Sequence, residues 1–97
     1  MPEESTNTYK LYSCELDYCM KTFSTTKDVK LGTPEANEFI EHVLDTIYHD
    51  LLWEWDYPLE PEDISKFRKY LEFTIERCTD ICIFRTIVGF EYVLARV

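Results

Sequence analysis

The clearest pattern of apolar and polar positions predicts a helix of about 20 residues, roughly 30 Å long, that begins after Gly32. Thr33 can cap the first turn with its hydroxyl, Pro34 suits the first helical position, and Glu35 suits the positive end of the helix dipole. Apolar residues then recur at intervals of three and four, at Ala36, Phe39, Ile40, Val43, Leu44, Ile47, Tyr48, Leu51, Leu52 and Trp55. They form a wide stripe that should face a core, and the helix should end within residues 54–56.

A second helix should begin at Pro61, after a short connector over residues 57–61. Glu62 and Asp63 lie in its first turn, where the helix dipole favours carboxylates. The apolar stripe that we expect to be buried consists of Ile64, Phe67, Leu71, Thr74, Ile75 and Cys78. Because the connector is short, the two helices should form an antiparallel hairpin whose apolar stripes require a sheet to cover them.

Residues 8–23 alternate between two faces with the period of a half-buried strand, after a frayed segment over residues 1–7. One face carries Tyr12, Cys14, Leu16, Tyr18 and Met20, and the other carries Ser13, Glu15, Asp17 and Lys21. The segment is long for one strand, so we expect either a bend or a hairpin within it. The best turn signal lies at residues 24–28, which would let residues 29–31 return as a short second strand.

Residues 81–97 are rich in β-branched and aromatic side chains, and both faces of the segment are largely apolar. We therefore expect a buried, central strand, or two strands joined near Gly89. The chain, residues 1–97, is then one α+β domain of order β-β-α-α-β, with the two-helix hairpin packed on one face of an antiparallel sheet. Apolar residues make up 45% of the chain, which excludes a disordered protein.

Acidic residues are concentrated in residues 32–65, which contain no Lys or Arg. They are Glu35, Glu38, Glu41, Asp45, Asp50, Glu54, Asp56, Glu60, Glu62 and Asp63. At ~100° per residue, the outer face of the first helix carries one row of six residues, namely Glu35, Glu38, His42, Asp45, His49 and Trp53. Glu41, Asp50 and Glu54 flank the row. Exposed helices usually intersperse both signs of charge, so this surface, which generates nearly all of the net charge of −9, is the strongest functional signal.

Several function classes are disfavoured. The sequence has no Gly-rich phosphate loop, no HExxH zinc signature and no marked nucleophile, so we expect neither an enzyme nor a cofactor. The basic residues are scattered and the net charge is negative, which disfavours direct binding to nucleic acid. No apolar run approaches the ~18 residues of a membrane span, and residues 1–7 do not resemble a signal peptide. We therefore expect an intracellular protein.

Two groups of residues have metal-ligand chemistry. His42, Asp45 and His49 share the outer row of the first helix with Glu38, although any helix aligns polar residues on its wet face. The four cysteines form two pairs without the two-residue gap of a typical zinc site, Cys14 with Cys19 and Cys78 with Cys82. We expect reduced and mostly buried thiols, with a metal site or disulfides as the alternatives.

These observations predict a small acidic protein that inhibits or sequesters a basic partner, most plausibly a nucleic-acid-binding protein or a nuclease. Trp53 would be an aromatic anchor unless it folds back over the connector. The expected contact residues are Glu35, Glu38, Glu41, Asp45, Asp50, Trp53, Glu54 and Asp56. In charge and size only, the chain resembles nucleic-acid mimics and nuclease-inhibiting immunity proteins. The alternatives are an acidic face that only maintains solubility, a structural subunit that homodimerises through its apolar C-terminal strand, and a metal-binding protein.

Overall fold

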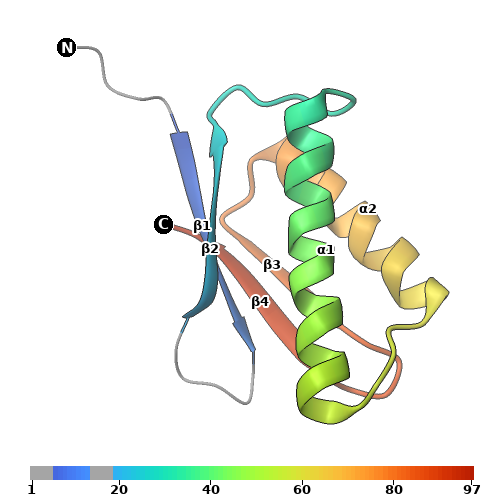
Figure 1. The fold of residues 1–97 in the computed structure, drawn as a ribbon. Coiled ribbons are helices and arrows are strands. Elements are labelled where there is room, and N and C mark those ends of the chain that lie inside the picture. The colour runs from blue at the N-terminus through green and yellow to red at the C-terminus, as the bar shows by residue number, and fades with distance from the viewer. Residues whose placement is uncertain (1–5, 14–18) are drawn as a thin grey trace.

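An antiparallel sheet of four strands carries two helices on one face in the computed structural model, which describes residues 6–13 and 19–97 (Figure 1). In chain order the elements are β1 (Thr6–Ser13), β2 (Cys19–Thr26), α1 (Pro34–Trp55), α2 (Pro61–Arg77), β3 (Ile81–Arg85) and β4 (Glu91–Arg96). The predicted α+β fold is confirmed, and the last segment is divided around Gly89. The sheet order is β2-β1-β4-β3, so β1 and β4 lie at the centre.

α1 forms where the local sequence signals agree. The Thr33 side chain accepts a hydrogen bond from the Ala36 amide at 3.2 Å, and Pro34 occupies the first turn. The helix ends at Trp55 and is followed by the C-cap residue Asp56, which has a left-handed φ of 51° and donates its N–H to the Leu51 carbonyl. The predicted stripe is buried at Ala36, Phe39, Ile40, Val43, Leu44, Ile47 and Leu51, and only its margin, at Tyr48, Leu52 and Trp55, is half-buried or exposed.

α2 also begins as predicted, at Pro61, but its first turn reaches into the interior. Asp63 is fully buried, although the sequence suggests only a favourable position in the helix dipole. Its carboxylate accepts hydrogen bonds from the Tyr57 hydroxyl and the Ile87 amide, both at 3.2 Å. At the other end, the prediction that Cys78 is buried is wrong, because the helix stops there in an exposed left-handed conformation with a φ of 53°.

β1 and β2 form an antiparallel hairpin, but the predicted turn is wrong. Residues 24–26 continue β2 because all three pair with β1, and residues 29–31 are not a strand. The strands are connected through residues 14–18, which lie outside the described residues. The predicted alternation of residues 14–18 therefore also lies outside the described residues. At the other end of β2, the Thr26 amide and hydroxyl donate to the Glu35 carboxylate at 2.9 and 2.6 Å, which joins the sheet to the start of α1.

The buried face of β1 is the opposite of the predicted one. Ser13, which the alternation assigns to the polar face, is buried, whereas Tyr12 is only half-buried. The odd-numbered residues face inward because Tyr9 packs under α1, with its ring centroid 5.1 Å from that of Phe39. Asn7 belongs to β1 and is buried on the same side. The prediction of a frayed segment over residues 1–7 is therefore wrong for Thr6 and Asn7, the two of these residues that the structure describes.

β4 is central as predicted, whereas β3 is an edge strand. The prediction of a buried, central segment over residues 81–97 is therefore wrong for β3. Cys82 and Phe84 face the core, while Ile81 and Ile83 face away from it and are exposed. The reason is that helices cover only one face of the sheet, and successive side chains of a strand point to opposite faces.

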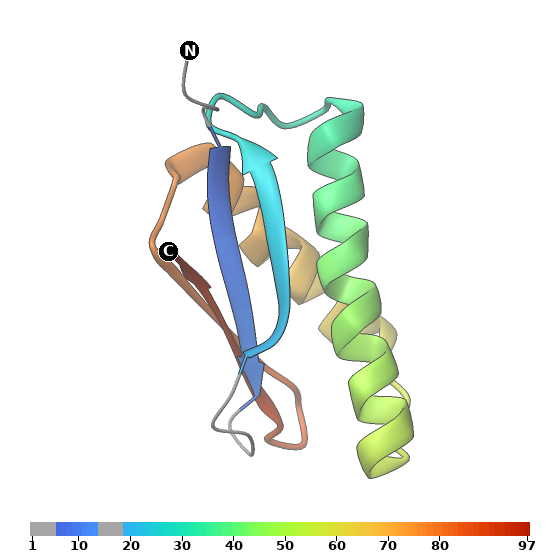
Figure 2. The ribbon, with the colours of Figure 1, turned by 60° about the vertical axis from the view of Figure 1, so that its left-hand side comes forward.

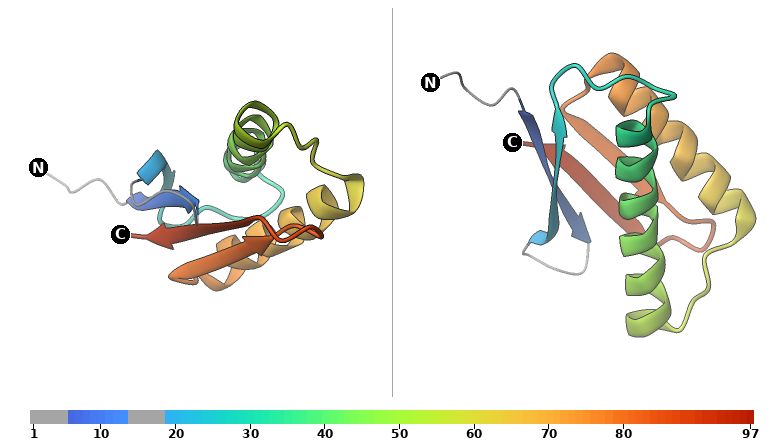
Figure 3. Two further views of the ribbon diagram at one scale, coloured as in Figure 1. Left: turned by 90° about the horizontal axis from the view of Figure 1, so that it is seen from below. Right: turned by 45° about the horizontal axis from the view of Figure 1, so that its top comes forward.

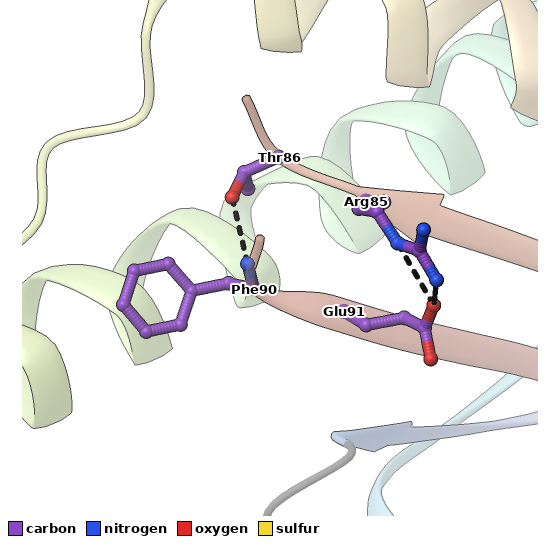
Figure 4. A network of polar contacts seen from close by, with 4 residues as sticks. All are labelled: Arg85, Thr86, Phe90 and Glu91. Carbon is purple, nitrogen blue, oxygen red and sulfur yellow. Dashed lines mark hydrogen bonds and ion pairs between the residues drawn. The ribbon is translucent and has the colours of Figure 1, made fainter. Parts of the chain in front are cut away.

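Polar contacts close the turn between β3 and β4 (Figure 4). The Thr86 hydroxyl accepts a hydrogen bond from the Phe90 amide at 3.0 Å, and the Thr86 amide donates to the Phe90 carbonyl at 2.8 Å. Gly89 has a φ of 103°, which favours a residue without a side chain. Next to the turn, the Arg85 guanidinium donates to the Glu91 carboxylate at 2.5 Å. These contacts help to fix the register between the two strands.

The core lies between the helices and the sheet, with α1 packed against β2 and α2 against β3 (Figure 3). Aromatic pairs mark both contacts. Phe39 of α1 lies 6.1 Å from Phe23 of β2, and Phe67 of α2 lies 5.1 Å from Phe84 of β3, measured between ring centroids. The helices therefore sit over opposite ends of the sheet, which separates the outward face of α1 from the edge formed by β3.

Candidate functional site

α1 lies at the surface of the molecule, with the side away from the sheet uncovered by other elements (Figure 2), and most of the predicted contact residues are exposed. Within the predicted set, Asp50 alone is not exposed; the exposed members are Glu35, Glu38, Glu41, Asp45, Trp53, Glu54 and Asp56. We call these seven residues the acidic face of α1. Its position follows from helical periodicity, because the opposite side of the helix carries the apolar stripe that faces the core.

Asp50 is turned toward the sheet instead. Its carboxylate accepts a hydrogen bond from the Tyr92 hydroxyl at 2.6 Å, and Tyr92 is buried. Burial, together with this hydrogen bond, raises the pKa of Tyr92 far above its ordinary value of 10.0, so the phenol stays neutral and donates. The prediction that Asp50 is displayed outward is therefore wrong, and its carboxylate holds α1 to β4.

Two acids of the face interact with neighbouring elements. Glu35 accepts the hydrogen bonds from Thr26, and Glu41 forms an ion pair with Arg68 of α2. Both carboxylates are exposed, and such surface pairs contribute about 0–1 kcal/mol, so a partner could replace them. The carboxylates of three other acids of the face have no hydrogen-bond or ion-pair partner among the described residues, namely those of Glu38, Glu54 and Asp56.

The histidines of α1 lie along their own helix rather than gathered into a cluster. His49 Nδ1 lies 2.9 Å from the Asp45 carbonyl and 3.5 Å from the carboxylate of the same residue, so the imidazole is engaged within its own helix. Over residues 6–13 and 19–97, no three His, Cys, Asp or Glu side chains are grouped so that they could hold an ion. His42, Asp45 and His49 share a helix face without converging on one point.

The three cysteines that the structure describes are free thiols. Cys82 is buried, Cys19 is half-buried, and Cys78 is exposed beside Arg96, which donates to its sulfur at 2.6 Å. The prediction of mostly buried thiols thus describes Cys82 but not Cys78. Cys14 lies outside the described residues.

An exposed aromatic ring lies near the acidic residues at the C-terminal end of α1. Trp53 is 80% exposed and does not fold back over the connector. Trp55 packs instead against Phe90 after the β3–β4 turn, with their ring centroids 5.4 Å apart, and Tyr57 of the connector also contacts Phe90. An indole left in water contributes little to folding, whereas its burial by a partner would contribute strongly to binding.

The C-terminal end of α1 also carries acidic residues, which are electrostatically unfavourable at that end of a helix. The C-terminus of a helix bears a partial negative charge, so a carboxylate there destabilises it by about 0.3–1 kcal/mol. Glu54 lies in the last turn of α1, Asp56 follows the helix directly, and the last turn contains no basic residue. Asp56 also has the left-handed φ of 51°, which glycine adopts at lower cost. Helix physics therefore predicts a local cost in stability at both residues.

A second exposed apolar region lies along β3 and α2. The sequence suggests a dimer contact through an apolar C-terminal strand, but it does not indicate that α2 takes part. Ile81, Ile83 and Phe73 are each more than half exposed. Together with Tyr70 of α2, they line a groove of about 200 Å³. Apolar residues on both faces of a strand predict that it lies at the centre of a sheet, and only the observed strand order shows that β3 is an edge strand.

Comparisons with known proteins assign no function. The chain matches no protein-family model, no curated protein and no solved structure. Neither helix of the described segments is long and apolar enough to cross a bilayer. A functional conclusion therefore depends on the surfaces described above.

Proposed function

We propose that this chain is a small intracellular binding protein that inhibits or sequesters a basic protein through the acidic face of α1. The observation that carries the proposal is the 80% exposure of Trp53 beside the carboxylates of Glu54 and Asp56. Arg and Lys side chains of the partner would pair with the carboxylates, and they would stack on the indole ring. Trp53 would then be the central anchor, with the acids forming a charged rim.

A nucleic-acid-handling protein is the partner class that best fits this surface. Proteins that bind nucleic acid present clustered Lys and Arg along a groove or helix face. α1 has 22 residues and therefore spans about 33 Å, a length that could follow such a groove. Its negative field would accelerate the encounter. Inhibition would follow from occupancy, because the acidic helix and the phosphate backbone could not fill the same groove together.

The competing hypothesis is that the acids only keep the protein soluble. Solubility would account for the net charge of −9, since added Asp and Glu favour it. It gives no reason to leave Trp53 exposed or to place Glu54 and Asp56 at the helix end that disfavours carboxylates. Both features are reasons to favour a binding surface.

A pair of matched charge reversals tests the proposal in capture experiments from a host-cell lysate. E38K/E54K reverses two acids that have no partner among the described residues, and E62K/E76K makes the same change on exposed residues of α2. Each Glu→Lys change adds two units, so both variants move the net charge from −9 to −5. We expect E38K/E54K to reduce capture of the partner at least ~10-fold and E62K/E76K to retain it. Equal capture by the two variants would contradict the proposal.

Trp53→Ala tests the anchor separately. Removing a central aromatic anchor typically costs about 2 kcal/mol or more, so we expect affinity to fall roughly 30-fold. Because Trp53 is so exposed, the free energy of unfolding in urea should change by less than about 0.5 kcal/mol. Unchanged affinity would show that the indole makes no contact with the partner.

A further inference from the structure

Among the described strands, none pairs with the outer edge of β3, because the sheet order β2-β1-β4-β3 leaves β4 as its neighbour. The Arg96 amide donates to the Asp80 carbonyl at 2.7 Å, and the register continues without a bulge along β3. Hydrogen-bonded pairs alternate in an antiparallel ladder, so even-numbered residues direct their backbone groups toward β4. The N–H and C=O groups of Ile81 and Ile83 therefore point away from β4, along the edge.

Both sides of this edge are apolar. On the sheet face away from the helices, Ile81 is 60% exposed and Ile83 is 53% exposed. On the helix side, Tyr70 and Phe73 of α2 stand beside the edge and line the groove of about 200 Å³. Natural edge strands usually carry an inward charge, a proline or a bulge that prevents pairing, and the run from Ile81 to Phe84 has none of these. The edge is thus open to another strand.

The distribution of charge along the chain favours β3 of a second copy of this protein as the strand that pairs with this edge. Residues 64–97 contain six Lys or Arg and four Asp or Glu, a net charge of +2, whereas residues 1–63 contain four and fifteen, a net charge of −11. Two copies that meet through β3 and α2 bring together the part of the chain whose net charge is small, so they avoid the repulsion between two strongly negative surfaces. α1 lies over β2, at the opposite end of the sheet, so its acids stay apart from the contact.

We infer that β3 pairs with β3 of a second copy, antiparallel, about a two-fold axis that passes through Cys82. In this register Ile81 lies opposite Ile83 of the second copy, so the outward backbone groups of both residues form hydrogen bonds. On the other side of the sheet, the two-fold axis brings Tyr70 and Phe73 of both copies together over the groove. The resulting dimer has one continuous sheet, with all helices on the same face.

The size of this contact sets its expected strength. The four exposed side chains, Tyr70, Phe73, Ile81 and Ile83, are 39–60% exposed. At roughly 200 Å² for a large apolar side chain, each copy contributes about 400 Å², and the pair of copies about 800 Å² before the backbone is counted. Stable complexes bury about 1,200–2,000 Å². The dimer should therefore be reversible, with a dissociation constant in the range of roughly 10–100 μM.

Two measurements over protein concentrations from about 1 μM to 1 mM test the inference. Sedimentation should report a mass that rises from one chain to two. In the same range, a dissociation constant of roughly 10–100 μM predicts that hydrogen exchange followed by NMR slows about 5- to 12-fold at the Ile81 and Ile83 amides, because these amides become hydrogen-bonded only in the dimer. The amides in the loop of residues 27–32 should exchange at an unchanged rate. Added salt should not dissociate the dimer, which distinguishes it from the contact made by the acidic face of α1.

Ile83→Lys places a charge on the edge and should weaken dimerisation at least ~100-fold. Val88→Lys is the matched control, because Val88 is 61% exposed in the turn after β3 and gains the same charge outside the contact. Ile83→Pro is a second variant that removes the outward N–H without adding a charge, a change that an edge strand tolerates, and it should also weaken dimerisation. Circular dichroism should show that all three variants are folded.

Three results would overturn the inference. The first is a monomer at every concentration, which would leave the groove to an extended peptide of another protein. The second is equal dimerisation of Ile83→Lys and Val88→Lys. The third is a dimer in which exchange at the Ile81 and Ile83 amides is independent of concentration, because its contact would then lie elsewhere.

Discussion

Replacing Asp63 by alanine should cause one of the largest losses of stability in the chain, although no sequence motif marks the residue. Its carboxylate is fully buried and accepts hydrogen bonds from the Tyr57 hydroxyl and the Ile87 amide. These bonds tie the connector and the β3–β4 turn to the first turn of α2. Asp63→Ala would leave both donors without their acceptor and would remove a carboxylate from the positive end of the helix dipole.

The size of the effect follows from these three interactions. Two hydrogen bonds to a charged acceptor contribute about 1.5 kcal/mol each, since both distances of 3.2 Å are at the long end of the normal range, and the dipole adds about 0.5 kcal/mol. Relief of the buried charge offsets part of this sum. We expect Asp63→Ala to lower the free energy of unfolding by about 3 kcal/mol, which corresponds to a fall in Tm of roughly 15 °C for a domain of this length.

Urea unfolding followed by circular dichroism measures the loss directly. Glu62→Ala is the matched control, because this neighbouring residue is exposed and carries the same charge in the same helical turn. Its substitution should change stability by less than about 0.5 kcal/mol. Asp63→Asn, which keeps one acceptor oxygen, should fall between the two. If Asp63→Ala and Glu62→Ala differ by less than about 1 kcal/mol, the reasoning about the buried carboxylate is refuted.

Three further predictions concern single contacts. Thr33→Ala removes the acceptor for the Ala36 amide and should lower the free energy of unfolding in urea by about 1 kcal/mol. Asp50→Ala leaves the buried Tyr92 hydroxyl without its acceptor; it should cost about 2 kcal/mol of stability, while capture of the partner by the folded variant stays unchanged. The pKa of Tyr92 is raised above 10.0, so its contribution is complete below pH 10 and is lost as the pH rises further, by about 1.4 kcal/mol per pH unit. Tyr92→Phe should flatten this alkaline slope, measured as the urea midpoint against pH, and an unchanged slope would contradict the assignment.

The helices could be predicted because their signals are local. The hydroxyl of Thr33, the proline that follows it and the three- and four-residue spacing of apolar positions all lie within the segment that folds. The buried faces of the strands are harder to predict from sequence, because they depend on which elements cover the sheet. The period-two pattern of β1 was read correctly, but only the packing of Tyr9 against Phe39 shows which set of alternate residues is buried.

In the candidate site, too, residues whose position depends on local periodicity could be predicted, and residues whose position depends on distant partners could not. Helical periodicity places Glu38, Trp53 and Glu54 on the surface, and the structure agrees. Asp50 could not be separated from them by periodicity, because its partner Tyr92 is 42 residues away in sequence. The sequence suggests a dimer contact through the apolar C-terminal segment, but it does not show that β3 is an edge strand, because the order of strands in a sheet depends on pairing between distant segments.

The most direct test of the acidic face of α1 is a salt ramp applied to the partner captured from the native host lysate with the wild-type chain as bait. We expect a basic nucleic-acid-binding protein to elute as ionic strength rises, because salt screens contacts between exposed charges, and we expect added DNA or RNA to compete for it. A partner that stays bound until denaturant is added, or the absence of any protein that elutes with salt, would contradict the central claim that the acids form the functional surface.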